Sequence, residues 1–233
     1  MKCYYDFHIH SCLSPCALKE MTPNNIINMA LLCGLNAIAI TDHNSADNVE
    51  AFLNVSKDKD IVVIPGIEVE TREEIHVITL LPTFEALNNM NQIIDNNLPS
   101  INNKTSIFGE QIILDEDDNE KGINERLLLT ATNMSIEEVF DITNRLKGVA
   151  IPAHVDRPSY SLISNLGWIP KNLGVTTVEI SKYADINKMK KKFTDYKVIQ
   201  SSDAHELEHI VDKNNYIEVK EITIENIINY LKN

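Results

Sequence analysis

The stretch that decides the fold is Ala37–Asn44, AIAITDHN, a near-continuous apolar strand that ends on a polar, ionisable motif. A helical pattern precedes it, with Thr22 as the expected N-cap. A second helical pattern follows over Ala46–Lys57 and leads into the apolar run Ile61–Pro65. Short apolar runs that alternate with helices are typical of parallel βα units. The sequence therefore predicts an α/β fold.

The same alternation continues toward both ends of the chain. The expected strands are Cys3–Ile9, Asn36–Thr41, Ile61–Pro65, Glu74–Leu81, Gly148–Pro152, Thr177–Ile180, Lys197–Ser201 and Tyr216–Lys220. Further helices are expected over Phe84–Asn96, from the capping box Ser135-x-x-Glu138, and from Thr223 to the end.

Between Pro82 and Met134 the alternation of strands and helices is interrupted, and this segment is interpreted as an insertion that forms an ordered cap. It holds a strand-like run, Glu110–Leu114, followed by the acidic run Asp115–Asp118. The alternative is a disordered loop, but residues 111–114 and 127–129 are too apolar for one. The chain is thus expected to be a single barrel domain over residues 1–233, with 82–134 as an insertion after the fourth strand.

The composition of the chain limits which classes of binding partner are expected. The chain has 34 acidic and 21 basic residues, a formal net charge of −13, which argues against duplex nucleic acid and anionic membranes as partners. No stretch approaches the about 20 apolar residues of a membrane span. The N-terminus enters a strand pattern without a signal peptide, so a cytoplasmic location and reduced thiols are expected for the four cysteines.

Six of the seven histidines fall at or just after the C-terminal ends of expected strands, the end where parallel barrels build their sites. They are His8, His10, His43, His76, His154 and His205. Each has a plainer interpretation alone: His8-x-His10 as a surface pair, and His76 as a satisfied core histidine. Their joint placement is hard to obtain by accident.

Carboxylates accompany these histidines. Glu68 and Glu70 follow Gly66 at the end of a strand, and Asp203 precedes His205 by two residues. Imidazole and carboxylate ligands suit Zn, Fe or Mn, and one ion uses at most about six of them. The number of ligands therefore predicts two or three divalent ions.

Six motifs together resemble the PHP (polymerase and histidinol phosphatase) family. In chain order they are His8-x-His10, Thr41-Asp42-His43-Asn44, Gly66-Ile67-Glu68, His76, Pro152-Ala153-His154 and Ser202-Asp203-Ala204-His205. The resemblance runs from Asp6 to His205. It implies a distorted (β/α)7 TIM-like barrel and hydrolysis of a phosphoester by a metal-bound hydroxide at a di- or trinuclear site.

The resemblance also implies a ligand set. The first metal would take His8, His10, Glu68 and Asp203, and the second would share Glu68 and add His76 and His154. The third would take His43 and His205 with a ligand from the loop after the first strand. This chain has Cys16 there, where similar members have His or Asp, so Cys16 is either a ligand that favours a soft ion or a plain thiol beside a proline.

Two residues are candidates for catalysis. Arg157 follows the His154 strand and could clamp phosphate oxygens, or else pair with Asp156 or a neighbour. Asp42 could orient His43 or shuttle a proton. The expected substrate is a small phosphorylated molecule, for example a nucleotide. A non-catalytic metal-binding module and an amidohydrolase-like hydrolase are the alternatives.

Overall fold

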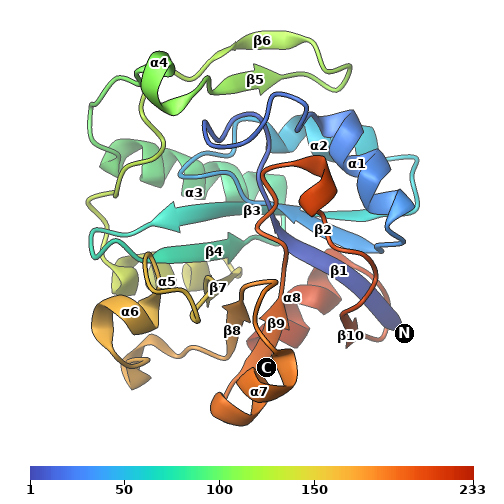
Figure 1. Ribbon diagram of the computed structural model, residues 1–233, viewed down its shortest axis with the longest axis vertical. Coiled ribbons are helices and arrows are strands. Elements are labelled where there is room, and N and C mark those ends of the chain that lie inside the picture. Colours follow the sequence, from blue (N-terminus) through green and yellow to red (C-terminus); the bar gives the residue numbers. More distant parts are fainter.

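The computed structural model describes residues 1–233, and its main sheet has the strand order β10-β1-β2-β3-β4-β7 (Figure 1). These strands are β1 (Lys2–Ile9), β2 (Ala37–Ile40), β3 (Val62–Glu70), β4 (His76–Leu80), β7 (Val149–Pro152) and β10 (Tyr216–Glu218). A second sheet pairs β8 (Thr177–Ile180) with β9 (Lys197–Gln200) in parallel. The α/β fold predicted from the sequence is confirmed.

The main sheet curls into a half-barrel whose strands are not all parallel. β1, β2 and β3 run parallel, but β3 pairs antiparallel with β4, and β4 with β7. No helix lies between β3 and β4, so the expected count of seven βα units is not confirmed. At the opposite edge of the main sheet, backbone hydrogen bonds between the β1 and β9 segments form only beyond the end of β9, where the amide of His10 donates to the carbonyl of Ala204 (3.0 Å).

Helices cover the outer face of this sheet (Figure 1). They are α1 (Pro23–Leu32), α2 (Val49–Ser56), α3 (Phe84–Asn97) and α5 (Ile136–Arg145), and their buried side chains share one core of 30 residues with the sheet. The inner face forms a second core closed by α8 (Ile224–Lys232). The predicted caps at Thr22 and Ser135–Glu138 are both present.

The remaining short elements lie in the connections. They are α4 (Thr105–Phe108), β5 (Ile112–Leu114), β6 (Glu120–Ile123), α6 (Leu162–Leu166), α7 (Ile186–Lys192), and the single 3-10 turns Lys171–Leu173 and Leu207–His209. No helix is long and apolar enough to span a bilayer. β6 has an exposed, charged sequence, which is why its strand was not predicted.

The expected insertion Pro82–Met134 divides into two parts. α3 packs its buried Leu87, Met90 and Ile94 into the outer core, so this helix belongs to the barrel. Residues 98–134 then form α4 and the β5–β6 hairpin above the loop that follows β1 (Figure 1). At the acidic tip of the hairpin, the Asp118 carboxylate accepts hydrogen bonds from the Thr22 hydroxyl (2.7 Å) and the Asn24 backbone amide (3.1 Å) at the start of α1, whereas Glu116 and Asp117 are exposed.

Candidate metal centre

Glu68 is the centre of the cluster of histidines at the mouth of the half-barrel. It is 1% exposed near the end of β3, and five imidazoles approach its two carboxylate oxygens. The nitrogen–oxygen distances are 3.2 Å for His8, 3.4 Å for His10, 3.0 Å for His43, 2.9 Å for His76 and 3.4 Å for His154. One carboxylate therefore joins five histidines from four separate segments of the chain.

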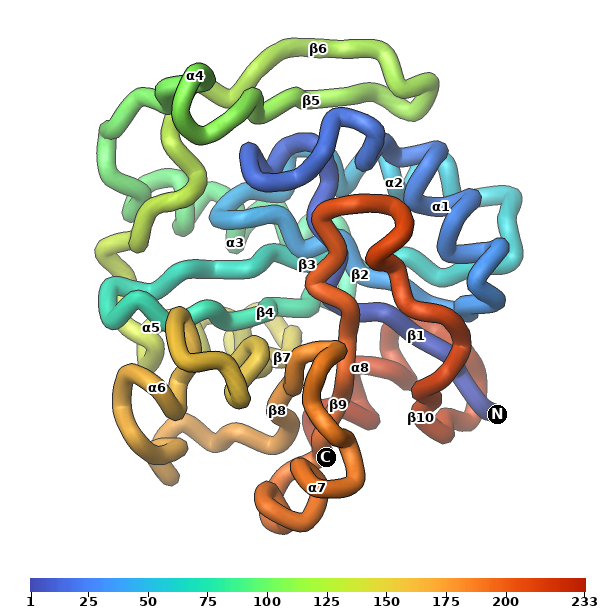
Figure 2. Tube along the Cα trace, in the orientation of Figure 1, coloured from blue at the N-terminus to red at the C-terminus, as the bar shows by residue number.

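Asp203 forms the second acidic point of the cluster. Its Oδ1 lies 3.1 Å from Nε2 of His10 and 3.3 Å from Nε2 of His8. The two histidines are two residues apart at the end of β1, so their side chains point to the same face. The loop that carries Asp203 after β9 lies beside the loop after β1 (Figure 2), where the amide of Leu18 donates to the carbonyl of His205 (2.9 Å).

Three of the seven non-glycine residues with positive φ lie at this cluster. Asp203 has φ +52°, His154 has φ +29° and Asn44, next to His43, has φ +50°. Side chains other than glycine adopt this left-handed region at a cost of about 1–3 kcal/mol, and such strain gathers at functional sites. The side-chain amide of Asn44 donates hydrogen bonds to the backbone carbonyls of Leu128 and Thr130, which stabilise this conformation.

The donor atoms fit divalent cations. Both oxygens of Glu68 and Nδ1 of His154 are buried without a hydrogen-bond partner, which is unusual for buried polar atoms. The cluster contains three groups of possible metal ligands, and within each group the ligand atoms lie within 4.8 Å of one another. The groups are His8, His10 and Asp203; His43, Glu68 and His76; and His10, His43 and His205. Burial raises the pKa of Glu68, but the imidazoles of His76, His8 and His43 outweigh it and hold that pKa well below its usual range.

Cys16 is exposed on the loop after β1, beside this cluster. Desolvation raises the pKa of its thiol, but the imidazoles of His43 and His205 outweigh that effect and lower the pKa to about 6. Cys3 and Cys12 are buried, and burial raises the pKa of each thiol to about 12. Of these three thiols, only Cys16 therefore lies in an environment that favours a thiolate.

Asp42 does not contact the ring of His43, so the expected orientation of that ring by Asp42 is not what the structure shows. Its buried carboxylate accepts hydrogen bonds from the Ser11 amide (2.7 Å), the Ser11 hydroxyl (2.6 Å) and the Ser14 hydroxyl (2.7 Å). The Ser14 hydroxyl oxygen also lies 3.0 Å from Nδ1 of His10. Asp42 thus acts on His10 through Ser14, because the loop after β1 folds over it.

Arg157 does not pair with Asp156. Its Nη1 lies 2.7 Å from Oδ2 of Asp203, and its side chain is 37% exposed at the mouth of the site. Asp156 instead accepts hydrogen bonds from the amide (2.7 Å) and hydroxyl (2.6 Å) of Ser181. The guanidinium is therefore held next to the cluster by a carboxylate that belongs to it.

Glu179 was not predicted from the sequence as part of this site. It lies on β8, is 1% exposed, and its carboxylate is 3.0 Å from Nδ1 of His8. The same carboxylate accepts a hydrogen bond from the backbone amide of His154 (3.1 Å). A lone acid in the apolar strand Thr177–Ile180 was the available indication, since an ionised side chain is rarely buried without a partner.

Several solved structures share this arrangement of helices and strands. The lesion-specific endonuclease PfuEndoQ from Pyrococcus furiosus is 23% identical with a TM-score of 0.77, over 100% of this chain and 56% of that chain. Endonuclease Q in complex with a 27-mer duplex substrate that has an abasic lesion at the active site gives the same score. A protein from Bifidobacterium adolescentis, described as a metal-dependent phosphoesterase, is 16% identical with a TM-score of 0.60, over 97% and 94% of the two chains. At these identities the likeness shows a shared fold.

Sequence comparisons identify the family. The uncharacterized protein MJ0043 of Methanocaldococcus jannaschii is 32% identical over 89 residues, which are 38% of this chain and 11% of that protein. This chain thus spans a small part of that relative and little more than half of the endonuclease. The sequence profile of the PHP domain matches residues 6–221, from β1 to beyond β10. With its histidines, Glu68 and Asp203 gathered at one mouth, this chain belongs to the PHP domain family.

Proposed function

We propose that this protein hydrolyses a phosphoester at a centre of two or three divalent ions. The observation that carries the proposal is the position of Glu68, whose two buried oxygens have no hydrogen-bond partner although five imidazoles lie within 3.4 Å. Cations placed between these atoms would coordinate both the carboxylate oxygens of Glu68 and the imidazole nitrogens. The proposed ligands are His8, His10, Cys16, His43, Glu68, His76, His154, Asp203 and His205, and the mixed imidazole and carboxylate set suits Zn, Mn or Fe.

When bound, the ions would supply Lewis acidity, which activates water and stabilises negative charge on phosphoryl oxygens. The residues around them orient the ligands. Glu179 fixes the ring of His8, and Ser14, held by Asp42, fixes the ring of His10. Held rings keep their metal-facing nitrogens deprotonated and correctly aimed, which is the usual role of such outer partners.

Arg157 is the proposed phosphate-binding residue. One arm of its guanidinium is engaged by Asp203, and the planar fork has further N–H donors at the half-exposed mouth. A phosphate oxygen that meets this fork lies next to the proposed ligand Asp203. Arg157 therefore both balances the charge of Asp203 and offers the substrate a cationic partner.

The first candidate substrate is a small phosphorylated molecule such as a nucleotide, selected by a cap formed from the insertion. The β5–β6 hairpin and α4 stand above the loop that carries Cys16, and Gly109 after α4 approaches the carbonyl of Pro15 so closely that a Cβ there would lie 2.2 Å from it. Loops at this edge of a barrel commonly set specificity. The expectation against duplex nucleic acid rested on the acidic run Asp115–Asp118 and on the net charge of the chain.

That charge is unevenly distributed, which favours a polynucleotide as a second candidate. Residues 157–197 hold eight basic and three acidic residues, whereas the rest of the chain holds thirteen basic and thirty-one acidic. Trp168 is 68% exposed and Tyr183 is 80% exposed in the same segment. Lysines that neutralise phosphates beside aromatic rings that stack on bases are typical of single-strand recognition. A fold shared with an endonuclease seen on duplex DNA supports this candidate.

One experiment separates these candidates and the alternatives. The protein is reconstituted with Mn²⁺ or Zn²⁺, and hydrolysis is measured on a nitrophenyl phosphate monoester, a diester, a 5′-labelled single-stranded oligonucleotide and a nitroanilide. Phosphoester cleavage that is lost on chelation supports the proposal. Cleavage of the nitroanilide alone would favour an amidohydrolase-like enzyme, and tight metal binding without any turnover would favour a non-catalytic module.

A further inference from the structure

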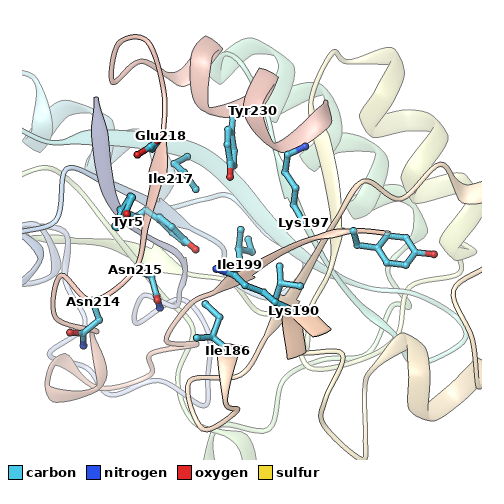
Figure 3. A pocket seen from close by; sticks show the side chains of 13 residues that line it. Tyr5, Ile186, Lys190, Lys197, Ile199, Asn214, Asn215, Ile217, Glu218 and Tyr230 are labelled. Carbon is cyan, nitrogen blue, oxygen red and sulfur yellow. The ribbon is translucent and has the colours of Figure 1, made fainter. Parts of the chain in front are cut away.

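A surface cavity of about 620 Å³ lies between β9 and β10, where the barrel wall is not closed by hydrogen bonds (Figure 3). β9 pairs only with β8, and β10 pairs only with β1. At one end, the amide nitrogen of the Asn215 side chain donates to the side-chain oxygen of Gln200 (3.1 Å) and links the two sides. The cavity is therefore a bounded gap between two strand edges.

A buried hydroxyl with an unused proton faces this gap. Tyr5 is 2% exposed and lines the cavity from β1. Its hydroxyl oxygen accepts a hydrogen bond from the amide of Gln200 (3.3 Å), but the hydroxyl donates to no protein acceptor. The hydroxyl proton is therefore free to be donated to an acceptor inside the cavity.

The charge lining the cavity is the opposite of the charge of the whole chain. Lys190 of α7 and Lys197 of β9 both line it, and neither forms an ion pair with a carboxylate. Glu218 is the single acid in the lining, in a chain of net charge −13. Nζ of Lys197 lies 5.5 Å from the ring centroid of Tyr230, which also lines the cavity. An anion is therefore favoured here over a cation.

The other lining groups suit a flat ring with hydrogen-bonding edges. Apolar side chains from α7, β9 and β10 face the same space as four tyrosines and the amides of Asn214 and Asn215 (Figure 3). The volume falls within the range of about 300–1,000 Å³ that holds small ligands. We propose that this cavity, between β9 and β10, binds a heteroaromatic anion of the size of a nucleoside monophosphate, with its anionic group at Lys190 and Lys197.

The proposed ligand site is separate from the metal centre. None of the histidines or carboxylates of that centre lines the cavity. Tyr5 precedes His8 by three residues on β1, about 10 Å at the usual rise of a strand. The proposal therefore stands whether or not the protein hydrolyses phosphoesters.

The test is calorimetric titration of the full chain with adenosine monophosphate, in a buffer with EDTA so that phosphate cannot bind through metal ions. One saturable site is expected. Lys190→Ala combined with Lys197→Ala should weaken it about tenfold or more, and Tyr5→Phe should weaken it about two- to tenfold, the effect of one lost hydrogen bond. The matched control is Lys191→Ala with Lys192→Ala, on the same helix but outside the lining, which should leave affinity unchanged.

Two smaller ligands, each lacking either the ring or the phosphate of adenosine monophosphate, test which part of the probe the cavity recognises. Adenosine and inorganic phosphate should each bind more weakly than adenosine monophosphate, because each loses either the anionic group or the ring. Absence of saturable binding at about 1 mM probe, or binding that ignores the lining variants, would overturn the proposal and leave the gap as a solvent-filled seam. Equal affinity for adenosine would overturn the assignment of the two lysines.

Discussion

The carboxylate of Glu179 lies 3.0 Å from Nδ1 of His8, and both side chains are buried. On the other side of the ring, Nε2 of His8 lies 3.2 Å from Glu68 and 3.3 Å from Asp203. A carboxylate at Nδ1 holds the proton there and leaves Nε2 free as a ligand atom. Glu179 thus determines which nitrogen of His8 faces the proposed metal centre.

We therefore expect Glu179→Gln to weaken metal binding about 10- to 100-fold, the usual cost of losing such a partner. Metal affinity is measured by competition with a chromophoric chelator. The control is Glu221→Gln, an exposed acid far along the chain, which should bind metal like the parent. Unchanged metal affinity in Glu179→Gln would show that the His8 ring does not need this partner.

Glu68→Gln should remove bound metal and activity more completely than Glu70→Gln. Glu68 contacts five imidazoles, whereas the nearest histidine nitrogen to Glu70 is Nε2 of His76 at 4.0 Å. An amide keeps the shape but removes the charge and one acceptor oxygen, so only the central residue should matter. Elemental analysis and phosphate release measure both variants, and equal losses would place the bridging carboxylate elsewhere.

Cys16 should be the first thiol alkylated by iodoacetamide at pH 7 in metal-free protein. Its pKa is lowered to about 6, so at pH 7 most of it is the reactive thiolate, and its reactivity should fall as the pH drops through 6. Cys3 and Cys12, with pKa values near 12, stay protonated and buried.

Zinc should then protect Cys16 if it is a ligand, because a coordinated thiolate no longer attacks the reagent. Mass spectrometry of the alkylated protein with and without Zn²⁺ measures this protection. Cys33→Ala, which alters a half-buried thiol outside the cluster, is the control and should show the same protection. An alkylation rate at Cys16 that zinc does not change would exclude it as a ligand.

Gly109→Ala should loosen the insertion. The residue has φ +101°, and an added Cβ would lie 2.2 Å from the carbonyl oxygen of Pro15, so both the backbone and the contact resist a side chain. We expect a loss of about 1–3 kcal/mol in stability and faster proteolysis of residues 98–134. Gly122→Ala, in β6 of the same insertion, has open space around its Cβ and should change neither Tm nor the cleavage rate.

Local sequence was sufficient for most elements and for the position of the ligands along the chain. The N-cap at Thr22 and the capping box at Ser135 depend on residues within one helical turn, and both are present. The strand ends that carry most of the histidines were predicted because buried parallel strands have short apolar runs. His76 is the exception: it is the first residue of β4, and it reaches the same mouth because β4 runs antiparallel to β3. The partners of these histidines were not predicted, since Glu179 is 171 residues from His8.

Long-range contacts also changed the interpretation of single residues. Asp42 was expected at His43, its neighbour in sequence, but the loop after β1 brings Ser11 and Ser14 onto its carboxylate. Arg157 was expected to bind phosphate or to pair with Asp156 or a neighbour, yet its partner is Asp203, which is distant in sequence and lies on the loop after β9. In the acidic run Asp115–Asp118, the Asp118 carboxylate accepts a hydrogen bond from the Thr22 hydroxyl at the start of α1, 96 residues away in the sequence.

The sequence by itself determined the α/β class and the gathering of the strand-end histidines, which follow from apolar periodicity and from the rule that ends of parallel strands share an edge. Its resemblance to the PHP family implied that Glu68 and Asp203 join these histidines. The tertiary structure alone decided which atoms meet: the five imidazoles on Glu68, the Glu179 partner of His8, and the open seam between β9 and β10. The physical reason is that these contacts join side chains across the sheet, and their geometry depends on strand register and curvature that no local pattern encodes.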